Sequence, residues 1–399
     1  MEIAALCGLL ILGIAGVAPP NIIFSGFGHP ALATIIAVFF ISQGIINSGL
    51  LRGLGQLLAG RTHSLRGQIL STASVGALLS SIMNNVGAVG LMLPTAVRMA
   101  KRAGQSPGSF GLPLAMFSIL GGTVTLIGSA PNIIIASYMF SATGQSFKMF
   151  DYAPHGLAMF ATALLLWLVC KYCGLDPGAG ETGRDDGAGL ADNDLNETIT
   201  FAPLATVERK ITLAVILLAV GLVSFGLLHP AYGFGGAAMV MIFFRVLKLP
   251  ADFNVVDLKI VFFLGAMLGI GQTLEHTGSL ELLSTFLARY TEGLPPFWLI
   301  VILIFAASAL SNAINNSASA VFMAPLAVGV AAGTSLQTAA ALMAVAAGAN
   351  LTLILPTHQS VLMVLSKAPF PVRSLMRFGL VLTLFCGMTA AAVITLLWQ

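Results

Sequence analysis

The chain has 399 residues, of which 57% are hydrophobic and only 8% are charged, and its mean hydropathy is +0.95. A soluble domain covers its surface with roughly a quarter charged residues, so this composition excludes a soluble globular protein and predicts an all-α polytopic membrane protein. The net charge of +3 resides almost entirely in predicted loops, and it gives no support to nucleic-acid binding.

Apolar runs long enough to cross the roughly 30 Å of hydrocarbon in a bilayer recur along the whole chain. They lie at 3–24, 29–48, 109–140, 152–172, 211–228, 231–247, 259–275, 336–366 and 375–398. Two further apolar stretches, 67–97 and 296–326, each carry an Asn-Asn pair near the middle. We predict re-entrant hairpins there, because backbone can break at membrane depth only where it is buried in protein or faces a wet cavity.

The basic residues predict the orientation of the chain. With the N-terminus inside and the C-terminus outside, only Lys148 and Arg289 of the 18 basic residues face outward. This is the asymmetry that the positive-inside rule requires. We therefore expect a multi-pass protein of a bacterial cytoplasmic membrane, with its N-terminus inside.

The two Asn-Asn pairs belong to an internal repeat. In each copy a serine lies four residues before the pair, and a proline lies at the same distance after it. The residues are Ser80, Asn84, Asn85 and Pro94 in the first copy, and Ser311, Asn315, Asn316 and Pro325 in the second. Buried carboxamides are costly unless they are paired or bind something. Twin clusters therefore suggest one site that is built from two symmetric halves.

The repeat also predicts the domain organisation. Five crossings, an odd number, precede the second half, so this half is inserted upside down, which makes two inverted-topology repeats. Each repeat contains a re-entrant helical hairpin and a broken transmembrane helix. The expected divisions are a first repeat at 1–173, a disordered cytoplasmic linker at 174–208, a linking transmembrane helix at 209–229 and a second repeat at 230–399.

The broken helix of each repeat is marked by a proline, with glycines as well in the first repeat. Residues 121–132 interrupt the span 109–140, and residues 350–360 interrupt the span 336–366. Glycine frees the backbone, whereas proline removes a donor and ends regular helix. A hairpin tip and a broken helix could together surround an ion.

Breaks at mid-membrane leave unpaired N–H groups at one helix start and unpaired carbonyls at another helix end. The N–H groups attract anions, while the carbonyls, with amide and hydroxyl oxygens, can coordinate sodium. Ser80 and Ser311 lie one turn before Asn84 and Asn315 and so share a helix face with them. These features predict a carrier for a small polar solute or ion.

No Asp, Glu, Lys or Arg falls deep within a predicted span. Proton-driven antiporters usually carry an ionisable side chain near the midplane, so the pattern favours coupling to a metal cation over coupling to protons. His358 in the second break could overturn this, because imidazole titrates near neutrality. Two interpretations stay open for it: a protonation or substrate group, or a neutral hydrogen-bonding residue.

These motifs resemble those of the divalent anion/sodium symporter family, the carriers of sulfate and of di- and tricarboxylates in the ion transporter superfamily. Residues 84–86 and 315–317 occupy the hairpin signature positions of that family. Residues 128–132 look like its first-break loop, and 356–359 are similar to a Pro-x-x-His-Gln form in its permeases. The resemblance covers nearly the whole chain.

The resemblance implies a set of site residues. Sodium would be held by Ser80, Asn84, Asn85, Gly128, Ser311, Asn315 and Asn316. The anion would contact Asn84, Asn85, Val86, Asn315, Asn316, Ser317, Pro356 and Thr357, with His358 as a further candidate. The family also implies a homodimer, an elevator-like movement, and sodium as the coupling ion with no other cofactor or metal.

The leading hypothesis is secondary uptake of a small divalent anion, sulfate or a dicarboxylate, driven by inward sodium. The alternative is an efflux permease or cation/proton antiporter of the same superfamily, with His358 in the proton path. A channel would need a continuous polar pore. An enzyme is not expected, because no nucleophile, carboxylate pair or metal-ligand cluster is predicted at the midplane. The expected partners are the anion, the lipid bilayer and a second copy of the chain.

Overall fold

The computed structural model describes residues 2–48, 64–170, 206–248, 252, 256, 258–279, 282 and 293–399. This part of the chain is helical and contains no strand, so the predicted all-α fold is confirmed. The predicted linker lies outside the described residues up to residue 205.

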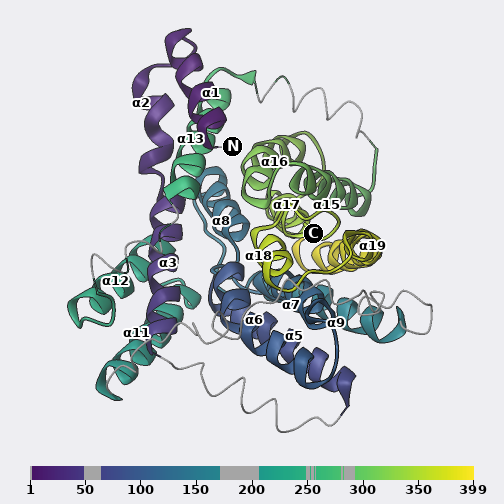
Figure 1. Ribbon diagram of the computed structural model, residues 1–399. Coiled ribbons are helices and arrows are strands. Elements are labelled where there is room, and N and C mark those ends of the chain that lie inside the picture. Colours follow the sequence, from purple (N-terminus) through teal and green to yellow (C-terminus); the bar gives the residue numbers. More distant parts are fainter. Residues whose placement is uncertain are drawn as a thin grey trace.

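One group of helices forms a bundle on the left of Figure 1. Within it α1 lies against α13, α3 packs along α12, and α11 contacts both α3 and α12. We call this group the flanking bundle. It comprises α1 (Glu2–Ile14), α2 (Pro20–Ile23), the 3-10 helix η1 (Phe24–Gly28), α3 (Pro30–Ser48), α11 (Thr206–Ser224), α12 (Pro230–Phe243) and α13 (Leu258–His276).

The other helices form a second body on the right of Figure 1, which contains both Asn-Asn hairpins. We call it the hairpin bundle. Its helices from the first half are α5 (Leu65–Ile82), α6 (Asn85–Arg102), α7 (Pro107–Gly122), α8 (Ala130–Thr143) and α9 (Ala153–Cys170). Those from the second half are α15 (Pro296–Ala313), α16 (Asn316–Gly333), α17 (Thr338–Asn350), α18 (Gln359–Lys367) and α19 (Val372–Trp398).

The two halves repeat one another and are interlocked. Each hairpin packs on the first part of its own broken helix, α5 and α6 on α7, and α15 and α16 on α17. The second part of each broken helix crosses to the other half, since α8 packs on α16 and α17 while α18 packs on α6 and α7. The helix interruptions expected at both Asn-Asn pairs and in both broken helices are present, and any site at the hairpin tips is shared by both halves.

Several helices have the dimensions of membrane spans. Among the described residues, four helical stretches are long and apolar enough, by length and composition, to cross a bilayer: Pro20–Ser48, Pro296–Ala313, Asn316–Gly333 and Val372–Trp398. Shorter apolar helices accompany them, including α12 and α17.

The prediction of one unbroken span at 3–24 is wrong. Helix α1 ends at Ile14, and its 13 residues extend only about 20 Å at 1.5 Å per residue. Gly16 then adopts a left-handed conformation with φ +68°, and the next helix begins with Pro19 as its N-cap and Pro20 as its first residue. A proline lacks the N–H that would continue a helix, and it disfavours helical backbone in the preceding residue.

Candidate functional site

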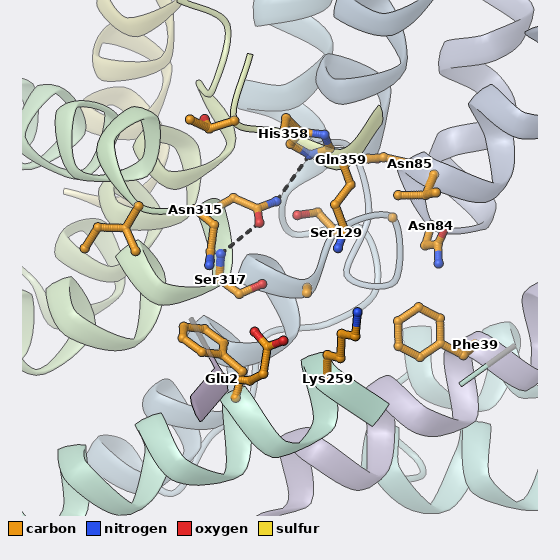
Figure 2. Close-up of a pocket in the computed structure, with 17 residues that line it drawn as sticks. Glu2, Phe39, Asn84, Asn85, Ser129, Lys259, Asn315, Ser317, His358 and Gln359 are labelled. Carbon is orange, nitrogen blue, oxygen red and sulfur yellow. Dashed lines mark hydrogen bonds between the residues drawn. The ribbon is translucent and has the colours of Figure 1, made fainter. Parts of the chain in front are cut away.

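A cavity of about 300 Å³ lies where the two hairpin tips meet the second break. Figure 2 shows side chains from both bundles directed toward this space. Most of the predicted site residues line it: Asn84, Asn85, Val86, Gly128, Asn315, Asn316, Ser317, Thr357 and His358. The structure thus brings residues from both repeats around one space.

Three predicted site residues do not line the cavity. Ser80 and Ser311 are fully buried behind the tips. Pro356 lies half-buried in the second break, one residue before the lining begins. The serines can therefore act only through their neighbours or on an ion held deeper than the cavity.

Four helix starts point at this cavity. Asn85, Ala130, Asn316 and Gln359 are the first residues of α6, α8, α16 and α18, and all four line the space. The first N–H groups of a helix have no partner within it, and the helix dipole is positive at this end. Helix starts are for this reason ready-made anion sites, and here four of them converge.

The two residues of each Asn-Asn pair have different tasks. The first asparagine caps a helix, because Asn84 Oδ1 accepts the Gly87 N–H at 2.7 Å and Asn315 Oδ1 accepts the Ala318 N–H at 2.8 Å. Such capping is a preferred role of asparagine. The second asparagine, Asn85 or Asn316, is left to face the centre.

The His358 imidazole lies between the two central amides. Its Nε2 atom is 3.4 Å from Nδ2 of Asn85 and 3.4 Å from Nδ2 of Asn316. Its Nδ1 atom accepts the Ser360 N–H at 3.1 Å, which makes His358 the N-cap of α18. A nitrogen that accepts carries no hydrogen, so the proton of the neutral ring is assigned to Nε2.

Three hydrogen-bond donors consequently converge. Asn316 Oδ1 accepts the Ser317 N–H at 2.9 Å, and Asn85 Oδ1 accepts the Ser80 hydroxyl at 2.5 Å, so both NH₂ groups turn toward the imidazole. The two NH₂ groups and the Nε2–H of His358 thus face one another as donors, and none of the three groups presents an acceptor to the others. Buried donors need acceptors, and an anion oxygen in the cavity would supply one.

A cluster of oxygen atoms lies behind the first tip. A Cβ built on Gly128 would lie 2.6 Å from the Gly122 carbonyl oxygen and 2.8 Å from that of Ser80. A Cβ on Gly122 would overlap Asn85 Oδ1 and lie 2.9 Å from the Gly128 carbonyl oxygen. The two glycines therefore let three carbonyl oxygens and one amide oxygen approach closely. Such oxygens are ligands that hard cations prefer.

The second half is not an identical copy of this cluster. The Ser311 hydroxyl donates to the Ala349 carbonyl at 2.6 Å and lies 2.5 Å from the Thr352 hydroxyl, rather than contacting Asn316. The Thr352 hydroxyl also donates to the Ala349 carbonyl, at 3.1 Å. The oxygen atoms behind the second tip thus come mainly from the end of α17 and the second break.

Two buried asparagines connect the two breaks. Asn350 Nδ2 donates to Asn132 Oδ1 at 2.9 Å, and the Ser129 hydroxyl donates to Asn350 Oδ1 at 2.5 Å. Asn132 Nδ2 in turn donates to the Thr125 carbonyl at 2.8 Å. Exposure of both asparagine side chains is 1% or less, so this link fixes the relative position of the breaks.

Sequence reasoning missed several residues of the cavity. Ser129 and Ala130 belong to the loop already singled out, and Gln359 to the second break, but none of the three was assigned. The opposite wall comes from the flanking bundle: Glu2, Phe39, Lys259 and Phe263. Nothing in the repeat pattern marked these four residues, because no equivalent motif accompanies them.

The family model described as CitMHS, citrate transporter, matches residues 1–349. This range contains both hairpins and the first break. The chain belongs to the citrate transporter family. The predicted membership of the ion transporter superfamily, among carriers with sodium/sulfate relatives, is confirmed. Members of the citrate transporter family and the related proteins are transporters rather than enzymes.

Two curated relatives match part of this citrate transporter family member. It is 31% identical over 166 residues to an uncharacterized transporter of Synechocystis, covering 41% of this chain and 27% of that protein. It is 29% identical over 140 residues to probable sodium/sulfate cotransporter 3 of Chlamydomonas reinhardtii, covering 33% of this chain and 16% of that protein. The matches thus span less than a third of the length of either relative.

A solved structure supports the fold. The YdaH transporter of Alcanivorax borkumensis is similar over 94% of this chain and 87% of that chain, with a TM-score of 0.63 and 14% sequence identity. At this identity the likeness concerns the arrangement of helices alone. It agrees with the all-α transporter fold of the citrate transporter family member described above.

Proposed function

We propose that this citrate transporter family member is a sodium-coupled carrier that takes up a small divalent anion, sulfate or a dicarboxylate. The observation that carries the proposal is the convergence of three donors, from Asn85, Asn316 and His358, at a cavity surrounded by four helix starts. Donors without acceptors favour an anion. The sodium/sulfate relative supports this cargo class.

Sodium would bind behind the tips. The first ion would use the oxygens around Ser80, Asn85 and Gly128, and the second those around Ser311, Asn315 and Asn316, with Asn84 completing the first tip. Asn85 would couple ion and cargo, because its Oδ1 faces the oxygen cluster while its Nδ2 faces the anion space. An ion on Oδ1 would hold the amide in the orientation that the anion needs, which amounts to a coupling free energy between the sites.

Transport would occur by an elevator-type movement of the hairpin bundle against the flanking bundle. All of the converging donors lie on the hairpin bundle, and between the bundles the main packing is of α13 on α16 and of α3 on α8. The body that carries the cargo could therefore move as a unit. The proposal includes a homodimer, the repeat boundaries 1–173 and 230–399, and an inside N-terminus in a bacterial cytoplasmic membrane.

Uptake by proteoliposomes tests the proposal. Purified protein is reconstituted, and the uptake of labelled sulfate, succinate and citrate is measured with an inward sodium gradient, with a pH gradient, and with neither. We expect uptake of at least one anion with the sodium gradient alone. Uptake that follows the pH gradient without sodium would instead support the antiporter hypothesis. Absence of anion uptake under every condition would contradict the proposal.

Substitution of His358 distinguishes a donor role from a proton path. Glutamine retains an N–H donor, whereas alanine removes it, so we expect His358→Ala to weaken anion binding roughly tenfold and His358→Gln to recover most of the loss. The Nδ1 atom already accepts the Ser360 N–H, so a second proton on the ring would break the α18 cap. Sodium-driven uptake should accordingly change less than about twofold between pH 6 and 8.

The exposed His276 at the end of α13 provides a matched control. His276→Ala should leave both anion binding and the pH profile unchanged. A tenfold change in wild-type uptake per pH unit that disappears in His358→Gln would show that His358 carries a transported proton.

A further inference from the structure

A pair of opposite charges faces the converging donors across the cavity. Glu2 begins α1 and Lys259 is the second residue of α13, and these two helices pack together in the flanking bundle. Both residues line the cavity, and Figure 2 shows the Lys259 ammonium directed into it, with the Glu2 carboxylate on the same wall. The Glu2 carboxylate interacts most strongly with its own backbone N–H and with the N-terminal amino group, and Lys259 adds a smaller electrostatic attraction.

These two are the only charged side chains among the described residues that line the cavity. The hairpin bundle contributes amides, hydroxyls, an imidazole and helix starts, none of which carries a full charge in the neutral state assigned above. A dianion leaves water for such a site at a high cost. An ammonium in the cavity wall offsets part of this cost, because charges interact more strongly near a protein interior than in water.

We propose that Lys259 is an anion-binding residue that the flanking bundle adds to the site. When the anion is absent, the Glu2 carboxylate neutralises the charge of the Lys259 ammonium. This inference rests on the proposed function. The donors and Lys259 lie on different bundles, so the anion contacts both only while the hairpin tips face the start of α13. Lys259 therefore strengthens anion binding in this arrangement, and it does not do so when the hairpin bundle has moved the tips away from α13.

Glu2 sets the specificity of this contact. An entering anion must compete with the Glu2 carboxylate for the ammonium, and a divalent anion does so with twice the charge of a monovalent one. The pair thus favours dianions over monovalent anions such as chloride. Removal of the Glu2 charge should strengthen anion binding and relax this preference, which is an opposite effect to removal of the Lys259 charge.

Anion binding by purified full-length protein tests the inference. Sulfate and succinate are titrated at saturating sodium by calorimetry and by thermal shift, against wild type, Lys259→Gln, Lys259→Arg and Glu2→Gln. We expect roughly tenfold weaker binding in Lys259→Gln, near wild-type binding in Lys259→Arg, and about threefold tighter binding in Glu2→Gln. Added choline chloride should narrow the difference between wild type and Lys259→Gln, because salt screens a charge contact.

Lys210 supplies the matched control, since it is an exposed lysine in the first turns of α11, also on the flanking bundle. Lys210→Gln should bind both anions as wild type does. Unchanged affinity in Lys259→Gln, alongside loss of binding in Asn85→Ala, would overturn the Lys259 inference and leave the proposed function standing. If wild type binds neither sulfate nor succinate, both fail. Should Lys259→Gln not fold, unchanged binding in Glu2→Gln overturns the inference.

Discussion

Gly128→Ala is expected to abolish sodium-dependent uptake. The added methyl would lie 2.6 Å from the Gly122 carbonyl oxygen and 2.8 Å from the Ser80 carbonyl oxygen, closer than carbon and oxygen atoms can approach without displacement. It would displace the oxygens that we propose as sodium ligands. We expect a loss of about a hundredfold or more in sodium-driven uptake, equal to roughly 2.7 kcal/mol. Flux assays in proteoliposomes over a range of sodium concentrations measure it.

Gly221→Ala is the control for this change. Gly221 lies in α11 and a Cβ there would meet nothing within 4 Å, so uptake should be preserved. Sodium-induced thermal stabilisation provides a second readout, because an ion that binds only the folded form raises its apparent stability. This stabilisation should vanish in Gly128→Ala and persist in Gly221→Ala. Normal sodium activation in a well-folded Gly128→Ala protein would refute a sodium site at the first tip.

Asn85→Ala and Asn316→Ala are each expected to cause a large loss of anion uptake. Each substitution removes one of the NH₂ groups that face His358, and it leaves the remaining buried donors poorly matched to an anion. One lost charge-assisted hydrogen bond, at roughly 1.5–3 kcal/mol, corresponds to about a ten- to hundredfold loss in transport. Labelled anion uptake at a fixed sodium gradient measures this loss.

The two substitutions should differ in their sodium dependence. Asn85 Oδ1 also accepts the Ser80 hydroxyl and borders the oxygen cluster, so Asn85→Ala should raise the sodium concentration needed for half-maximal uptake as well. Asn21, an exposed asparagine in α2, offers a control of the same type in Asn21→Ala. Uptake within a few-fold of wild type in either tip variant would show that the central amides do not hold the cargo.

Asn85 is the residue through which sodium and anion would communicate. Its amide has one end at the oxygen cluster and the other at the imidazole of His358. A rotation of the amide that satisfied one ligand without the other would lose a hydrogen bond on the opposite side. Mutual dependence of the two ligands therefore follows from one rigid side chain, and it requires no large rearrangement within the tip.

Local sequence patterns were sufficient for the hairpins and the breaks. An asparagine before an apolar run is a strong helix start, and Asn84 and Asn315 both act as N-caps. Glycine and proline marked the first break and Pro356 marked the second, because the backbone preferences of these residues act over a few positions. The same preferences show why the span at 3–24 was misjudged. That prediction was based on hydropathy alone and gave no weight to Gly16 and the two prolines after it.

The partners of the site residues could not be read from the sequence. Asn85 and His358 are 273 positions apart, and Asn132 and Asn350 are 218 apart. Symmetry of the repeats suggested that Ser80 and Ser311 would have equivalent roles, yet their hydroxyls have different acceptors. Small differences in packing between the halves decide which oxygen a hydroxyl meets, and an approximate repeat does not specify them.

The sequence by itself determined an all-helical membrane protein with two related polar tips, because hydropathy, caps and helix-breaking residues act over short stretches of chain. Only the tertiary structure decided that His358 joins the tips as a third donor and that Lys259 and Glu2 form the facing wall. Those relations depend on how α8 and α18 exchange between the halves and on where α1 and α13 lie against the tips. Packing between distant segments sets such positions, and no local pattern encodes them.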